Sequence, residues 1–135
     1  MSRPSLLPLF LVLLLVLSAG CRRRGDHFSH DSAREAAERI FACLVEHRYG
    51  DYVMACNGSD SMPQAYRSQL EDMAAQFMDR QQKARGGILS AASTADTLMP
   101  SDSSARVYMD VVFADSQQEQ ISLCLLFRNG RWKLR

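Results

Sequence analysis

Apolar residues recur every three or four positions between residues 32 and 87, which is the spacing of one face of an α-helix. The first predicted helix begins at Ser32, because Ser32-Ala33-Arg34-Glu35 has the pattern of a capping box. It is expected to end at Tyr49-Gly50. The side chains expected on its inward face are Ala37, Ile40, Phe41, Leu44 and Val45.

Two further helices are predicted before residue 87. A short one covers residues 51–56, and the turn-forming residues 57–61 follow it. A long one begins near Met62-Pro63, since proline is tolerated in a first turn, and ends at Gly86-Gly87. Its expected inward side chains are Tyr66, Leu70, Met73, Ala74 and Phe77.

Beyond Gly87 the pattern changes to strict alternation, which predicts strands that are covered on one side. Residues 121–127 form one such strand, and an earlier one has the inward positions Val107, Met109, Val111 and Phe113. A third segment, from Ile88 to Leu98, is a weaker strand because its small side chains offer little to pack, as suits a sheet edge.

The strongest turn signal is Arg128-Asn129-Gly130-Arg131, which predicts a two-residue hairpin loop. Counting outward from that loop, Phe127 lies opposite Trp132 and Leu125 lies opposite Leu134. Four apolar side chains then share one face of the hairpin, so the predicted register is self-consistent.

Helices followed by strands predict an α+β fold, with N-terminal helices packed on one face of an antiparallel sheet of three or four strands. Residues 32–135 provide enough chain for a single small domain with one core.

An apolar run from Leu6 to Leu17 precedes this domain and predicts a secretory signal peptide over residues 1–20. The run is too short to span a bilayer. It ends in Leu17-Ser18-Ala19-Gly20-Cys21, which resembles the lipobox of bacterial lipoproteins. The resemblance implies that Cys21 carries a diacylglyceryl group and becomes the first residue of the mature chain. The alternative is an ordinary secretory signal followed by a chance cysteine.

Residues 21–31 are polar and lack helical periodicity, so they are expected to form a lipid-anchored tether. Arg22-Arg23-Arg24 would lie against anionic headgroups, each contributing on the order of 1 kcal/mol. In Gram-negative lipoproteins an Asp directly after the cysteine resembles an inner-membrane retention signal, and here that position is Arg22. The resemblance therefore implies an outer-membrane location in the cell envelope. An acidic stretch after the cysteine, which resembles the surface-export signal of some lipoproteins, is missing, so a domain that faces the periplasm is expected rather than one displayed on the surface.

The charge balance of the predicted domain bears on one class of partner, nucleic acids. The chain has 16 Lys and Arg against 15 Asp and Glu, but four of the cations, Arg3 and Arg22 to Arg24, belong to the leader and tether. Asp26 and Asp31 also lie in the tether, so residues 32–135 have 12 cations against 13 carboxylates. A slightly acidic domain is a poor nucleic-acid binder, so no nucleic-acid partner is predicted.

Three cysteines besides Cys21 lie in different predicted elements: Cys43, Cys56 and Cys124. Their spacing does not fit a zinc site, whose ligands come in close pairs. In an oxidising compartment an odd number leaves at least one thiol without a partner in the chain. Two interpretations stand: small buried apolar residues, or one disulfide, for which Cys43 with Cys56 is the preferred pair.

Three segments carry a resemblance at the level of the fold. They are Gly50-Asp51-Tyr52 after the first helix, Lys83-Ala84-Arg85-Gly86-Gly87-Ile88 at the helix-to-strand junction, and residues 127–134 at the end. In this order they resemble the nuclear transport factor two-like, or cystatin-like, superfamily, and more narrowly a group of bacterial lipoproteins without an assigned activity. The resemblance implies a curled sheet that forms a cone with the helices, and this cone is either filled by side chains or open to a ligand.

Candidate catalytic groups fall outside the predicted cone. Tyr108 and Asp110 alternate with inward apolar residues and so face solvent, although a one-residue slip would turn them inward as a donor and a base. His27 and His30 lie in the tether, and His47 lies near the end of the first helix, off its apolar face. No nucleophile elbow, phosphate loop or dinucleotide motif is present, so no catalytic residue, metal or cofactor is predicted.

Two functions remain as hypotheses. The first is a membrane-tethered, non-catalytic module that binds a small apolar ligand or an envelope protein through its cone or outer sheet face. The second is a small hydrolase or isomerase that uses the cone. Methionines and aromatic residues expected near the cone suit either an adaptable apolar cavity or a packed core. These residues are Phe41, Tyr52, Met54, Tyr66, Met73, Phe77, Met78, Met109 and Phe113.

Overall fold

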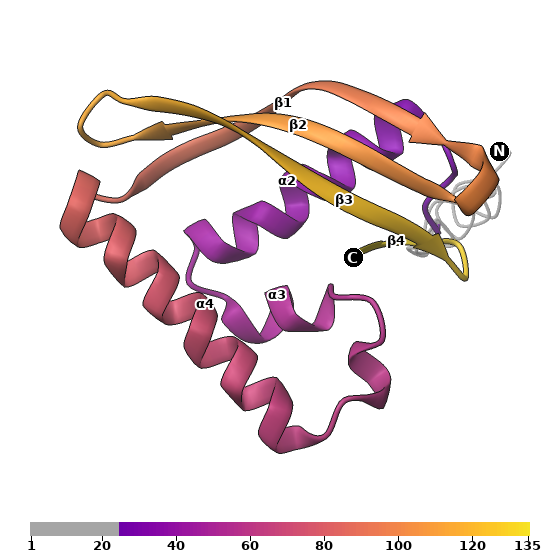
Figure 1. Cartoon of the computed structure of the whole chain (residues 1–135), viewed down its shortest axis with the longest axis horizontal. Coiled ribbons are helices and arrows are strands. Elements are labelled where there is room, and N and C mark those ends of the chain that lie inside the picture. The colour runs from indigo at the N-terminus through magenta and orange to yellow at the C-terminus, as the bar shows by residue number, and fades with distance from the viewer. Residues whose placement is uncertain (1–24) are drawn as a thin grey trace, which may run out of the picture.

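The computed structural model describes residues 25–135 as three α-helices, two short 3-10 helices and one four-stranded sheet (Figure 1). In chain order the elements are α2 (His30–Val45), α3 (Tyr49–Met54), η1 (Ser59–Ser61), α4 (Gln64–Arg85), β1 (Ile88–Met99), η2 (Pro100–Asp102), β2 (Ser104–Phe113), β3 (Gln118–Arg128) and β4 (Arg131–Leu134). The predicted signal peptide, Cys21 and the arginines 22–24 lie outside the described residues.

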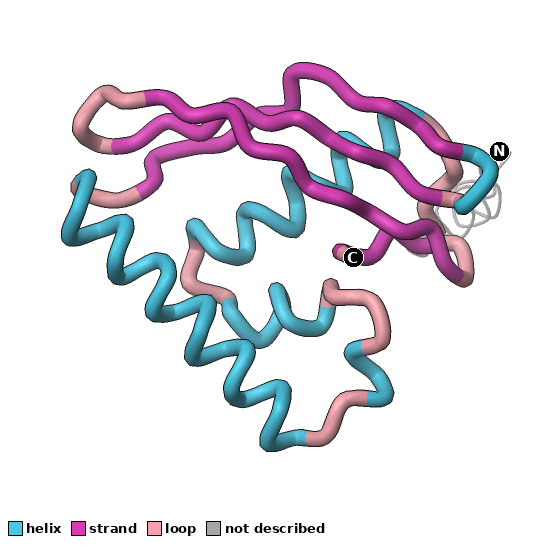
Figure 2. The backbone as a smooth tube through the Cα atoms, viewed as in Figure 1, coloured by secondary structure: helices cyan, strands magenta, loops and turns pink. Residues whose placement is uncertain are grey.

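The sheet is antiparallel with strand order β1-β2-β3-β4, so neighbours in sequence are neighbours in space. All three helices lie on one side of it (Figure 2). The predicted α+β arrangement, with helices first and an antiparallel sheet afterwards, is therefore confirmed.

The sheet is less curled than the resemblance implies. Bulges bend a sheet, and the two register shifts lie only in the edge strand β1. The central pair β2 and β3 runs without interruption from Ser104 opposite Leu126 to Val112 opposite Gln118. The sheet is therefore not strongly curled.

The core lies between the sheet and α2. The alternating positions of β2 are buried as the sequence predicts, and they meet the apolar face of α2. The fully or nearly fully buried side chains of these two elements are Ala33, Ala36, Ala37, Ile40, Phe41, Cys43, Leu44, Ala105, Val107, Met109, Val111 and Phe113. Alanines on α2 allow this helix to lie close to the sheet.

The β3–β4 hairpin has the predicted register, with Phe127 opposite Trp132 and Leu125 opposite Leu134. Asn129 and Gly130 have φ of 52° and 70°, which is the left-handed backbone that a two-residue turn of this kind requires. Trp132 is 3% exposed and packs on Phe127, with ring centroids 5.0 Å apart. This part of the prediction is confirmed.

The described end of the predicted tether is packed against that hairpin. Phe28 stacks on Trp132, with ring centroids 5.4 Å apart, and meets Phe127 edge-on at 5.7 Å. The backbone N–H of Trp132 donates to the Asp26 carboxylate over 3.0 Å. The packed part of the chain thus reaches back beyond the predicted domain start at Ser32.

The start of α2 differs from the predicted capping box. Ser29 is the N-cap, and its hydroxyl accepts from the Ser32 N–H at 3.2 Å. The Ser32 side chain instead donates to the His27 carbonyl and accepts from the Trp132 indole N–H at 2.8 Å. Because residues 26–29 pack onto Trp132, the N-cap is Ser29 rather than Ser32, three residues closer to the N-terminus.

The predicted end of the first helix at Tyr49-Gly50 is also wrong. The helix ends at Val45, because His47 adopts a left-handed φ of 58° and reverses the chain. Tyr49 and Gly50 belong to α3 instead. After α3, the N–H of Leu134 donates to the Ala55 carbonyl at 2.8 Å, so this segment joins the edge of the sheet next to β4.

Two carboxylates fasten α2 to the edge strand β1. The Glu38 carboxylate accepts from both the N–H and the hydroxyl of Ser93, at 2.9 and 2.7 Å. A bulge at Thr94 follows. Beyond it the alternation of inward and outward side chains is shifted by one residue, so Asp96 points inward opposite Val107. The Asp96 side chain is 2% exposed and pairs with His30 and with Arg34 at 2.6 Å.

Trp132→Ala should lower the free energy of unfolding by roughly 3 to 5 kcal/mol, since it removes a buried ring and leaves a cavity. Trp132→Phe keeps an aromatic ring but loses the bond to Ser32, so it should cost less. Denaturant unfolding curves followed by circular dichroism measure both. A loss below about 1 kcal/mol for the alanine variant would contradict the buried position.

Stability should also fall in acid through Asp96. Burial opposes ionisation, but the bonds to His30 and Arg34 outweigh it and hold the Asp96 pKa below its ordinary value of 3.8. A carboxyl with a lowered folded pKa stabilises the fold above its unfolded pKa, and this contribution is lost as the pH falls through the folded pKa. Asp96→Asn should therefore lower stability at neutral pH and flatten its decline below about pH 4.

Denaturation midpoints measured at several pH values test this, with Asp72→Asn as the control. Asp72 is exposed on α4 and forms no ion pair with a described residue. Equal pH profiles for Asp96→Asn and the control would exclude a stabilising role for the Asp96 pair.

Candidate functional site

The apolar face of α4 is largely uncovered, which corrects the prediction for this helix. Of the five side chains expected to point inward, only Ala74 is buried, whereas Tyr66, Met73 and Phe77 are 48%, 63% and 37% exposed. The helix lies against α3 and near the start of β1, and it diverges from the sheet (Figure 1). Its apolar stripe therefore faces a space that the core does not fill.

That space is an apolar groove between α4, α2, α3 and the inner face of β3, with a volume of about 480 Å³. We call it the apolar groove. It is lined by Phe41, Leu44, Tyr52, Val53, Cys56, Leu70, Met73, Ala74, Phe77, Ile121, Leu123, Leu134 and Arg135. Several of these lining residues, such as Met73 and Phe77, are among those that the sequence places near the cone. The sequence pattern does not show whether the cone is filled or open.

The polar groups of the apolar groove are poorly suited to acid–base chemistry. None of its described lining residues is a carboxylate or a histidine. Burial raises the pKa of the Cys56 thiol, against a weaker opposite effect of Lys133, and burial likewise raises the pKa of Tyr52. The Cys56 thiol donates to the Tyr52 carbonyl at 3.7 Å. These groups are neutral donors rather than bases or nucleophiles at neutral pH.

The candidate catalytic residues from the sequence do not meet in the apolar groove. Tyr108 and Asp110 lie opposite Ser122 and Gln120, on the sheet face away from the helices, so the one-residue slip does not occur. The histidines are dispersed: His30 pairs with Asp96, and His47 Nδ1 lies 2.6 Å from the Tyr49 hydroxyl. Within residues 25–135, no three potential ligands cluster around a metal position.

The three cysteines beyond the tether are unbridged, so the preferred Cys43–Cys56 disulfide is not formed. Cys43 is buried in α2, where its thiol donates to the Arg39 carbonyl at 3.4 Å. Burial raises its pKa. Cys43 therefore behaves as a small core residue, in agreement with the first of the two interpretations.

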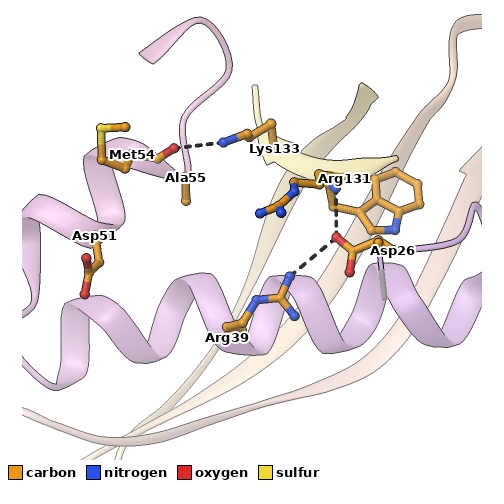
Figure 3. Close-up of a pocket in the computed structure, with 9 residues that line it drawn as sticks. Asp26, Arg39, Asp51, Met54, Ala55, Arg131 and Lys133 are labelled. Carbon is orange, nitrogen blue, oxygen red and sulfur yellow. Dashed lines mark hydrogen bonds and ion pairs between the residues drawn. The ribbon is translucent and has the colours of Figure 1, made fainter. Parts of the chain in front are cut away.

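A second, polar hollow lies on the other side of α3, beneath the hairpin (Figure 3). We call it the polar hollow; its volume is about 710 Å³. It is lined by Gly25, Asp26, Arg39, Asp51, Met54, Ala55, Arg131, Trp132 and Lys133. No sequence pattern predicts it, because its charged residues come from segments far apart in the chain and each one alone is typical of an ordinary surface charge.

Among the helices of residues 25–135, none is both long and apolar enough to cross a membrane. The predicted lipid attachment point lies outside these residues.

No family model and no curated protein matches this sequence. Among solved structures, the chain is similar to a Campylobacter jejuni protein described as a candidate NTF2-like transpeptidase. The two share 12% of their residues, with a TM-score of 0.60, over 74% of this chain and 94% of the other. The likeness shows an NTF2-like fold, and the predicted resemblance to the nuclear transport factor two-like superfamily is confirmed at the level of the fold.

Proposed function

We propose that this protein is a lipid-anchored, non-catalytic binding module of the bacterial cell envelope, and that its apolar groove takes a small apolar ligand. The observation that carries the binding role is the uncovered stripe on α4, where Met73 and Phe77 face a groove that the core leaves open. Leaving large apolar side chains exposed forgoes burial energy that a filled core would provide, so a groove of this kind is typical of a site that a ligand completes.

The chemistry of the apolar groove favours binding over catalysis. Acid–base or nucleophilic catalysis needs a titratable group in the right protonation state within reach of the substrate. Apart from the Arg135 guanidinium, the groove offers a thiol and a phenol whose pKa values are both raised by burial. Binding needs only shape, apolar area and a few polar groups, and the groove provides these.

The name of the Campylobacter jejuni protein suggests a transpeptidase as the specific form of the enzyme hypothesis. A transpeptidase needs an activated nucleophile, and Cys56 is the nucleophilic residue of the apolar groove. Its raised pKa, and the lack of a histidine among the described lining residues, argue against that role. Fold similarity alone does not transfer an activity.

The binding role predicts that an apolar fluorescent probe such as N-phenyl-1-naphthylamine binds saturably to the protein. Met73→Gln places an amide in the groove and should weaken this binding about five- to tenfold, equivalent to about 1 to 1.4 kcal/mol. Because Met73 is already 63% exposed, the stability of the fold should change little.

Leu89→Gln is the matched control, since Leu89 is also 63% exposed but does not line the apolar groove. Fluorescence titrations of the three proteins provide the measurement. Equal weakening by both substitutions, or no saturable binding at all, would count against the groove as the site.

The anchor rests on the lipobox pattern that ends at Cys21. Expressed in a Gram-negative host, the protein should be recovered from the membrane fraction with two or three acyl chains on residue 21. Cys21→Ser should give an unprocessed or soluble product, because the sulfur that accepts the diacylglyceryl group is gone. Intact-mass spectrometry of the extracted protein decides, and a mature protein without added acyl mass would refute the anchor.

A further inference from the structure

We infer that the polar hollow between the hairpin and α2 is a binding site for a phosphate-type oxyanion. Its cations come from two elements on opposite sides of the space: Arg39 from α2, and Arg131 and Lys133 from β4 (Figure 3). This site is separate from the apolar groove, with which it shares no lining residue. The inference therefore does not depend on the proposed function.

The two carboxylates of the polar hollow are already occupied. Asp51 pairs with Arg48, whose guanidinium lies 2.9 Å away and outside the hollow. Asp26 accepts the backbone N–H of Trp132 at 3.0 Å and lies 3.5 Å from Arg39. Neither carboxylate thus remains to balance the cations of β4.

The two cations of β4 have N–H donors left for a ligand. Arg131 and Lys133 form no ion pair with a described carboxylate. The Lys133 ammonium donates to the Met54 carbonyl at 3.0 Å, which occupies one of its three N–H groups. Alternate residues of one strand point to the same side, so Arg131 and Lys133 reach the hollow together, with Trp132 between them in sequence.

This arrangement suits an oxyanion with several acceptor oxygens. A guanidinium binds two oxygens of a phosphate at once, and an ammonium adds a point charge with rotatable donors. A free phosphate and the phosphodiester of an anionic lipid headgroup share the required chemistry.

Trp132 lies between Arg131 and Lys133 in β4 and is the only tryptophan in the chain, so its fluorescence is a probe placed next to the polar hollow. The experiment uses the full chain in neutral detergent micelles. One arm adds sodium phosphate, with sodium chloride at matched ionic strength as the reference. The other arm adds phosphatidylglycerol to the micelles, with phosphatidylcholine as the reference. We expect saturable changes with phosphate or phosphatidylglycerol that the reference additions do not produce.

The double variant Arg131→Gln/Lys133→Gln should weaken this binding about tenfold or more, since it removes both unpaired cations. Arg128→Gln removes one charge from the same hairpin outside the hollow and should bind like the wild type. Arg131→Lys with Lys133 retained should recover part of the affinity, and circular dichroism should show that all variants are folded.

The two arms separate the sources of the anion. A response to phosphatidylglycerol assigns a lipid headgroup, and a response to phosphate alone assigns a free oxyanion; both support the site. No saturable response in either arm overturns it, as does a response that chloride reproduces or that Arg128→Gln weakens as much as the double variant does.

Discussion

The packing of Trp132 holds together parts of the chain that are far apart in sequence. Its ring packs with those of Phe28 and Phe127 in one cluster, its indole N–H reaches Ser32 in the first turn of α2, and its backbone N–H reaches Asp26. The last strand, the first helix and the segment before that helix therefore meet at one side chain. An indole is both large and a hydrogen-bond donor, so the Trp132 side chain supplies the ring packing and the bond to Ser32 together.

The far side of the helical layer has no comparable cluster. Behind the Trp132 cluster, α2 is held on the sheet by its apolar face and by Glu38 and Asp96. By contrast, α4 buries only Ala74 and Met78 and otherwise relies on α3. The domain is thus tightly packed between α2 and the sheet and open between α4 and β3. The apolar groove follows from this unequal distribution of packing.

Much of the fold could be predicted from the sequence, because alternation and the Asn129-Gly130 turn determine strand facing and register. The errors have specific physical causes. Periodicity shows which side chains of α4 share a face, but not whether another element covers that face. The inward position of Asp96 depends on a bulge at Thr94, which breaks the alternation that sequence reasoning relies on. The polar hollow combines Arg39 with β4 through tertiary contacts alone, so no local pattern reveals it.

The attachment of residues 26–29 has a mechanical consequence. A pull on the chain at Gly25 acts first on the bond between Asp26 and the Trp132 backbone and on the stacked Phe28 ring. From there the load passes into β4 and the start of α2, the best-packed part of the molecule. The load path does not include α4, which forms one wall of the apolar groove, but it reaches the opposite wall through α2 and Leu134. Tension at the N-terminal end therefore acts on the α2 and β4 wall of the apolar groove and leaves the α4 wall unloaded.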